Sequence, residues 1–316
     1  METPVFLVNG FLESGKTTFI GETMKDPQFR NAGNVLVLLC EEGEEELDEV
    51  GLAKKGVSIL PIEELSQLTP QFLDQLDKYY KPDMVLVEYN GMWKTEDFLD
   101  LEFPDDWMMG QVITLIDSTT FLNFYNNMRS FFADNVRFSD VIICNRVDQN
   151  TDKLFIRRSI KPLNRQAQIM YETAEGIDDT EIVEELPFDV NADVIEIQDD
   201  DFGLFYMDAM DNPSKYANKK IKFKGLMFYN GKIPHNTFVP GRMAQNCCEQ
   251  DRTFIGFMAK PPKGKNTSDY ELRGWYMIEA EIKIEFQKMY RGKGPVMYCT
   301  SVTPTSVPEE TVVYFT

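Results

Sequence analysis

Gly10-Phe11-Leu12-Glu13-Ser14-Gly15-Lys16-Thr17-Thr18 is the stretch that decides the fold of the N-terminal half of this chain. It fits the phosphate-binding pattern GxxxxGK(S/T), with the apolar run Val5–Val8 before it and a helix-compatible run, Lys16–Met24, after it. The glycines let the backbone wrap a phosphate chain, with N–H groups pointing inward at the positive end of the following helix. The alternative is a plain glycine turn between a strand and a helix.

In the P-loop interpretation, Lys16 reaches the β- and γ-phosphates of a nucleotide and the Thr17 hydroxyl binds Mg²⁺. The residues that we expect to contact the nucleotide in this loop are Gly10, Glu13, Ser14, Gly15, Lys16, Thr17 and Thr18.

The composition limits the class of protein. The chain has 316 residues, enough for two domains, and its apolar fraction of 43% is ordinary for a globular protein. A formal charge of −20 argues against a nucleic-acid partner or an anionic membrane, since both select basic surfaces. We find no apolar run long enough to span a bilayer and no signal peptide, and the five cysteines suggest reduced thiols. We therefore expect a cytoplasmic protein.

Buried strands alternate with helical segments through the first half of the chain. Such alternation predicts an α/β fold, here a P-loop NTPase with a mainly parallel sheet and helices on both faces. A helix is expected to begin at Thr69-Pro70, because proline suits the first helical position. The predicted strands after Val5–Val8 are Val35–Leu39, Met84–Val87, Val112–Ile116, Val141–Cys144 and Ile169–Tyr171.

A second motif, Asn145-Arg146-Val147-Asp148, follows the strand that ends at Cys144. Guanine presents two neighbouring donors, an N1–H and an exocyclic amine, and the Asp148 carboxylate can accept both. Adenine lacks this pair, so ATP would leave the carboxylate unpaired. Asn145 is expected to tie this base loop to the P-loop, and Arg146 to lie over the base. The motif therefore predicts GTP and GDP as ligands; a polar strand end is the alternative.

Acidic residues gather at the ends of two other strands. Seven acids occupy the nine positions 41–49, which is either a solvated loop or a Mg²⁺-linked switch beside the P-loop. Glu88 ends the next strand, where a P-loop NTPase keeps its second metal-side carboxylate. We predict that Lys16, Glu41 and Glu88 are catalytic, and that Glu41 and Glu88 join Thr17 as Mg²⁺ contacts, direct or through water.

The first 170 or so residues resemble the CobW/HypB/UreG group of P-loop GTPases, and within it the CobW-like branch. That branch carries GFLGSGKTT, NEFGE, ETSG or ESTG, NKxD and LNPxAxI in order along the chain. The corresponding segments here are Gly10–Thr18, Cys40–Glu44, Glu88–Gly91, Asn145–Asp148 and Leu163–Ile169. The resemblance implies a Mg²⁺-dependent GTPase in metal trafficking or metal insertion, with a metalloprotein as client.

The chain departs from this branch in its cysteines. CobW-like proteins usually carry a CxCC metal motif after NEFGE, whereas the aligned stretch 56–60 contains no cysteine. Cys40 replaces the family asparagine; it is either part of a relocated ligand set or, as we favour, a half-buried cysteine at a strand end. No arginine finger is evident in the sequence, so we expect slow intrinsic turnover.

The remaining chain is divided at composition changes. We predict a GTPase domain over 1–175, an acidic connector over 176–216 and a small all-β, OB-like barrel domain over 217–316. OB barrels often bind nucleic acid, which the acidity disfavours. The predicted strands of the last domain are Ile221–Tyr229, Thr237–Asn246, Thr253–Ala259, Trp275–Phe286 and Pro295–Thr303.

The last part resembles the soluble domain of YcgQ-like proteins, which occur with predicted membrane permeases. The resemblance rests on Asn212–Tyr216, Phe238–Met243, Cys247–Asp251 and Gly274-Trp275. It implies an alternative function, a GTP-dependent switch that acts on a membrane permease component without a metal cargo. A further alternative is a module that holds GTP without hydrolysing it, and ATP use is a minor third.

Cys247 and Cys248 are adjacent and can scarcely bridge each other. With Asp251 and the only histidine, His235, they form a candidate site for Zn²⁺ or Cu⁺. The alternative is a pair of strand residues, one facing the core and one facing outward. Cys144 and Cys299 are expected in the core.

Overall fold

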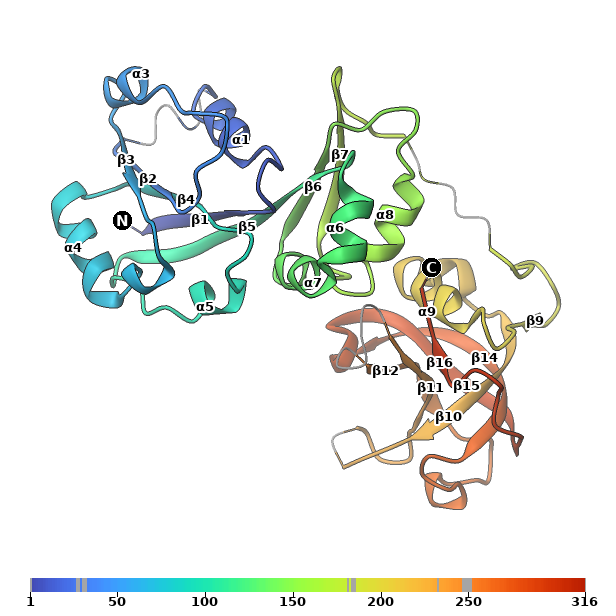
Figure 1. Ribbon diagram of the computed structural model, residues 1–316. Coiled ribbons are helices and arrows are strands. Elements are labelled where there is room, and N and C mark those ends of the chain that lie inside the picture. Colours follow the sequence, from blue (N-terminus) through green and yellow to red (C-terminus); the bar gives the residue numbers. More distant parts are fainter. Residues whose placement is uncertain are drawn as a thin grey trace. The chain divides into compact units, whose positions relative to one another are not determined.

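The computed structural model describes residues 2–26, 29, 33–180, 182, 186–231, 233–245 and 252–315. It divides the chain into two compact units, Met1–Ile182 and Val183–Thr316 (Figure 1). The composition changes predicted that the first domain ends at residue 175 and that 176–216 form a connector. In the structure the first unit runs to Ile182, and the helical part of the predicted connector is packed in the second unit.

The first unit is built on a mainly parallel sheet, as predicted. Its strands follow the order β3-β2-β4-β1-β5-β6-β7-β8, and every neighbouring pair except β7 with β8 is parallel. The strands are β1 (Thr3–Asn9), β2 (Val35–Leu39), β3 (Val57–Pro61), β4 (Met84–Glu88), β5 (Trp107–Asp117), β6 (Val141–Asn145), β7 (Gln168–Thr173) and β8 (Gly176–Ile177).

Helices cover both faces of this sheet. Side chains alternate between the two faces along each strand, and apolar side chains on each face pack against helices. Val5 and Leu7 of β1 pack with Leu73 of α4, whereas Val8 packs with Ile20 of α1. The helical segments are α1 (Lys16–Thr23), α3 (Glu49–Ala53), η1 (Leu65–Gln67), α4 (Pro70–Tyr80), α5 (Thr95–Leu99), α6 (Phe121–Asn127), α7 (Arg129–Arg137) and α8 (Lys153–Ile160). The parallel ladder brings the carboxyl ends of β1, β2, β4, β5 and β6 to one edge, where the P-loop and the acidic residues lie.

The start of α4 confirms the predicted helix signal. Thr69 is the N-cap, its side chain accepts a hydrogen bond from the Phe72 N–H, and Pro70 occupies the first helical position. In the described part of the chain no helix is long and apolar enough to cross a bilayer, which takes about 20 residues.

The second unit is a largely antiparallel sheet. Its main path is β12-β11-β10-β14-β15-β13, in which only β13 and β15 pair in parallel; β16 adds to β11 and β9 to β10. One isolated antiparallel bridge joins Phe238 to Ala259. The strands are β9 (Ile195–Glu196), β10 (Lys220–Phe228), β11 (Val239–Ala244), β12 (Thr253–Gly256), β13 (Met258–Lys260), β14 (Trp275–Gln287), β15 (Gly292–Pro304) and β16 (Val312–Val313).

A helix inside the predicted connector supplies much of the core of this unit. Phe202 and Phe205 of α9 are fully buried and pack with Phe223 of β10 and with Phe257. Aromatic side chains of this size dominate core energetics, so the acidic composition around them does not make this segment a linker. The helical segments of the second unit are α9 (Phe202–Asp211), η2 (Pro213–Tyr216), η4 (Thr267–Asp269) and η5 (Lys288–Tyr290).

Candidate functional site

The P-loop connects β1 to α1 through two glycines in the left-handed region, Gly10 with φ 137° and Gly15 with φ 94°. A Cβ at Gly10 would lie 2.4 Å from the Leu115 carbonyl oxygen, so the loop lies directly against the backbone of β5. Helix α1 begins at Lys16, immediately after the loop. The first N–H groups of the helix therefore lie at the loop, the arrangement that binds phosphate.

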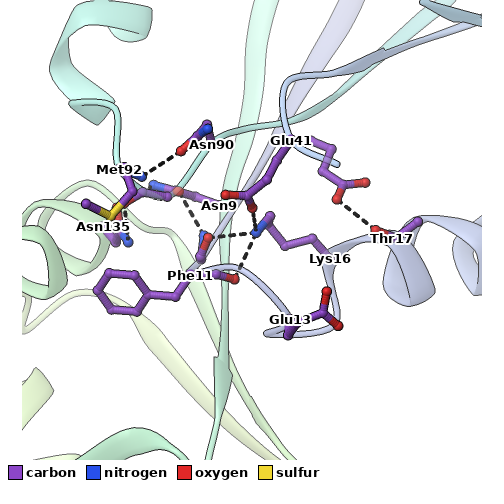
Figure 2. A network of polar contacts seen from close by, with 12 residues as sticks. Asn9, Phe11, Glu13, Lys16, Thr17, Glu41, Asn90, Met92 and Asn135 are labelled. Atoms are coloured by element: carbon purple, nitrogen blue, oxygen red, sulfur yellow. Dashed lines mark hydrogen bonds and ion pairs between the residues drawn. The ribbon is translucent and has the colours of Figure 1, made fainter. Parts of the chain in front are cut away.

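Lys16 is buried inside the loop, with 3% of its surface exposed. Its ammonium donates to the carbonyl oxygens of Gly10 (2.8 Å) and Phe11 (2.9 Å) and to Glu41 Oε2 (2.5 Å), as Figure 2 shows. An ammonium has three protons, and these contacts use all of them. An incoming phosphate must therefore compete with Glu41 for Lys16.

Thr17, the residue after Lys16, contacts Glu88 at the end of β4. The Thr17 hydroxyl donates to Glu88 Oε1 (2.8 Å), and Glu88 Oε2 is buried without a hydrogen-bond partner in the structure. Burial raises the pKa of Glu88, while the bond from Thr17 and the charge of Lys16 lower it in part. A hydroxyl and a carboxylate with an unpartnered oxygen are hard donors, so this pair fits Mg²⁺.

A buried polar network supports the P-loop from behind, and sequence reasoning missed it. Asn9 is fully buried; its Oδ1 accepts from the Gly10 N–H, and its Nδ2 donates to Thr95 Oγ1 (2.9 Å) and Asn135 Oδ1 (3.2 Å). Asn135 also donates to the Gly91 carbonyl, and a Cβ at Gly91 would lie 2.2 Å from the Gly10 carbonyl oxygen. The loop therefore has a satisfied, closely packed support.

The base loop, residues 145–148, contacts the P-loop as expected. Asn145 Nδ2 donates to the Ser14 carbonyl at 2.8 Å. Arg146, at φ 52°, donates through Nη1 to the Glu13 carbonyl (2.9 Å) and to Asp117 Oδ2 (2.5 Å). Its guanidinium is thus already engaged by the P-loop and β5. Asp117 was not among the predicted site residues; its position, one residue beyond a predicted apolar strand, was the available signal.

Asp148 is exposed and is preorganised by its own turn. Its carboxylate accepts hydrogen bonds from the Asn150 N–H (2.9 Å), the Asn150 side-chain amide (3.1 Å) and the Thr151 hydroxyl (3.1 Å). These hydrogen bonds lower the pKa of Asp148, and the bond from the Asn150 backbone has the largest effect. The side chain is therefore an ionised acceptor at neutral pH, which is what recognition of two guanine donors requires.

A cavity of about 530 Å³ joins the two motifs. A smaller space of about 20 Å³ lies among Lys16, Thr17, Glu41 and Glu88, and Gly15, Thr18 and Arg146 line both. The larger cavity has the size of a small-molecule site, with the P-loop and Asp148 both in its wall. Its walls come from the P-loop, α1, β5, the base loop and the end of β7, through Gly15, Thr18, Phe19, Leu115, Asn145–Asp148 and Glu172–Ala174.

The structure describes only part of the predicted cysteine metal site. Cys247 and Cys248 lie outside the described residues, and His235 is exposed. Over the described ranges, no group of three or more His, Cys, Asp or Glu side chains is arranged to hold a metal ion. Cys40 is buried, and burial, followed by the charges of Glu88 and Glu41, raises its pKa above the ordinary value. Cys40 is therefore a neutral thiol without a bound metal.

Residues 4–171 match the CobW/HypB/UreG nucleotide-binding domain, and residues 173–315 match the DUF1980 C-terminal domain. No curated protein matches the chain.

Similar solved structures include the hydrogenase maturation factor HypB from Archaeoglobus fulgidus (18% identity, 55% of this chain and 82% of that chain, TM-score 0.42). Another is Zn(II)-bound YjiA GTPase from E. coli (17% identity, 84% and 92%, TM-score 0.42). A third is HypB from Helicobacter pylori in complex with nickel (16% identity, 54% and 80%, TM-score 0.36).

Proposed function

This chain belongs to the CobW/HypB/UreG family through its nucleotide-binding domain, and on that premise we propose that it is a Mg²⁺-dependent GTPase that acts in metal trafficking or metal insertion. One observation carries the nucleotide part of the proposal. A single cavity of about 530 Å³ has the P-loop in one wall and the ionised Asp148 in another, and the Asn145–Ser14 bond joins the two loops. This arrangement suits a guanine nucleotide with its phosphates on the P-loop.

Hydrolysis begins, in this proposal, with an exchange at Lys16. The ammonium leaves Glu41 for the β- and γ-phosphates, where it offsets the charge that develops as the γ-phosphoryl group is transferred. Thr17 and Glu88 are the residues that would hold Mg²⁺, which supplies further neutralisation of the phosphates when bound. The Glu41 carboxylate, released from Lys16, is then available to orient the attacking water.

The nucleotide proposal is tested by GTP hydrolysis and by competition between nucleotides. Lys16→Ala should lower the rate by roughly 100-fold or more, since it removes a charge that stabilises the transition state. Phosphate release that continues at close to the unmodified rate after this substitution would contradict the assignment.

Base choice is tested separately through Asp148. Asp148→Asn should reduce the preference for GTP over ATP by roughly 100-fold, because two charge-assisted hydrogen bonds to guanine are replaced. Asp105→Asn, at an exposed position before β5, is the matched control and should keep the preference of the unmodified chain. An unchanged preference in Asp148→Asn would show that guanine is not the recognised base.

The metal part of the proposal is tested with Zn²⁺. GTP hydrolysis is measured on metal-stripped protein with Mg²⁺, with and without one equivalent of Zn²⁺, beside a Cys247→Ser, Cys248→Ser double variant. A rate that responds to zinc in the unmodified chain and not in the double variant supports coupling of nucleotide and metal through these cysteines. If zinc neither binds nor changes the rate, the metal role fails for zinc and the permease-linked switch becomes the better hypothesis.

We also propose that the second unit closes as an OB-like barrel. The support is the Phe238–Ala259 bridge, which links the residue before β11 to β13 at the other end of the strand path. An experimental structure with a continuous ladder between these segments would bear this out, and one with an open edge at β13 would refute it.

A further inference from the structure

Glu13 occupies a P-loop position at which the CobW-like pattern has glycine. Its backbone keeps the left-handed conformation, with φ 62°, which disfavours any residue with a side chain. The side chain is exposed, and its Oε1 accepts a hydrogen bond from the Glu44 N–H at 2.8 Å. Gly43 lies against the same oxygen, since a Cβ there would be 3.0 Å from Oε1. A carboxylate of the P-loop thus binds the backbone of the loop that follows β2.

That loop, residues 41–48, is called here the acidic loop. It contacts the P-loop at two points three residues apart: Glu41 pairs with Lys16, and the Glu44 N–H binds Glu13. Figure 2 shows Glu13 at the turn of the P-loop that leads into Lys16. The backbone carbonyl oxygen of Glu13 also accepts a hydrogen bond from the Arg146 guanidinium, so the base loop contacts the same residue.

The two contacts of the acidic loop respond differently to a nucleotide. Lys16 has no proton left for a phosphate while it keeps its three acceptors, so one of these contacts must break when phosphate binds. We expect the contact to Glu41 to break, because that side chain can move away while the two carbonyl oxygens belong to the P-loop backbone. The second uses a backbone N–H and a side chain that Lys16 does not contact in the structure. It can therefore keep the acidic loop beside the phosphate pocket after the first contact is lost.

We propose that Glu13 is a positioning residue: its carboxylate anchors the acidic loop so that Glu41 stays near the transferred phosphate when Lys16 changes partners. This rests on the GTPase function proposed above. Glu13 also lines the small space beside Lys16, so its negative charge opposes the phosphates and weakens nucleotide binding. The Glu13 side chain therefore lowers the affinity for the nucleotide and, at the same time, holds Glu41 in position.

The anchor is tested first without any nucleotide, by hydrogen exchange of the Glu44 amide in the full chain. Glu13→Gly should speed this exchange by about tenfold, because it removes a hydrogen bond to a charged acceptor. Glu13→Gln should restore protection to within about threefold, because its amide oxygen accepts the same bond. Glu42→Gln, which removes one charge from the same loop, is the control. Equal exchange in Glu13→Gly and the unmodified chain, or equal exchange in the two Glu13 variants, would overturn the proposal.

Steady-state GTP hydrolysis then separates positioning from affinity. Both Glu13 variants should lower KM, because both remove the charge. Only Glu13→Gly should also lower kcat, by about tenfold, while Glu13→Gln recovers most of it. Equal loss of kcat in the two variants would overturn the positioning role. If the unmodified chain does not bind or hydrolyse GTP, the proposed function fails, whereas the amide-exchange experiment still decides whether Glu13 anchors the loop.

Discussion

At the scale of one residue, the ammonium of Lys16 both stabilises the folded P-loop and forms part of the candidate phosphate site. Its ammonium closes the P-loop on two carbonyl oxygens and holds the acidic loop through Glu41, with side-chain exposures of 2% and 10% for the ion pair. Removing one partner from such a partly desolvated ion pair leaves the other charge without compensation, which costs free energy. We expect nucleotide binding to break this pair, so the pair lowers the affinity of the chain for a phosphate.

Glu41→Gln should therefore strengthen binding of GDP and GTP, by about three- to tenfold, because a neutral amide holds Lys16 less firmly than a carboxylate does. The measurement is a titration with a fluorescent guanine nucleotide, with Glu42→Gln as the control for removal of one charge. Hydrolysis should become slower in the same variant, since Glu41 is the group proposed to orient water. Weaker binding would mean that Glu41 contacts the Mg²⁺–nucleotide complex instead.

The positions that meet at the candidate site could be predicted where they share a local motif, and not where the fold brings distant positions together. Lys16, Thr17 and Asn145 follow from spacing within nine-residue and four-residue motifs. Asn9 gains its role from Thr95 and Asn135, which are 86 and 126 positions away. Nothing local in the sequence distinguishes such an asparagine from a solvated one.

At the scale of elements, continuous apolar runs predicted the buried strands well and short edge strands poorly. Val35–Leu39 is a strand with the predicted bounds, because it is buried between neighbours on both sides. Strand β3 was missed, because Ser58 interrupts its short apolar segment between Gly56 and Pro61, which lies at the sheet edge and is only partly buried. The predicted strand Thr253–Ala259 is divided at Phe257, whose side chain is fully buried in the aromatic core.

A buried arginine joins several elements of the second unit. Arg242 of β11 is 1% exposed; it donates to Asp199 Oδ1 (2.5 Å), to the Lys224 carbonyl of β10 and to the Glu310 carbonyl, and it lies 4.9 Å from the Trp275 ring. Partial burial raises the pKa of Asp199, but the bonds from Lys224 and Arg242 outweigh it and leave the pKa lowered. Asp199 therefore balances a charge that the sheet has taken out of water.

Asp199→Asn should destabilise the second unit by about 1–3 kcal/mol at neutral pH, because the buried guanidinium loses a charged partner. Since the folded-state pKa of Asp199 lies below the unfolded value, its contribution is present above 3.8 and is lost as the pH falls through the folded-state pKa. The difference in unfolding free energy between the variant and the unmodified chain should thus narrow only below pH 3.8. Urea unfolding at several pH values measures this, with Asp193→Asn as the exposed control. A difference that stays the same down to pH 3 would assign the loss to packing rather than charge.

At the scale of the whole molecule, the nucleotide site lies within one of the two units. Every residue that lines the larger cavity falls between Gly15 and Ala174, and the polar network behind the P-loop falls between Asn9 and Asn135. The first unit, Met1–Ile182, also has its own hydrophobic clusters on both faces of its sheet, and Ile182 packs on one of them. A unit with a complete core and a complete site meets the physical requirements for folding alone.

The fragment 1–182 should therefore fold and bind guanine nucleotides with a dissociation constant within about twofold of that of the full chain, as expected for a site whose described lining residues all belong to the first unit. Circular dichroism tests the fold, and titration with a fluorescent nucleotide tests binding. Fragment 1–175 is the informative comparison, because it ends at the boundary that the sequence analysis predicts and lacks Ile177 of β8 and the packed Ile182. It should be the less stable of the two. A folded 1–182 fragment that fails to bind nucleotide would mean that the second unit takes part in forming the site, and the two units would then have to be treated as one functional assembly.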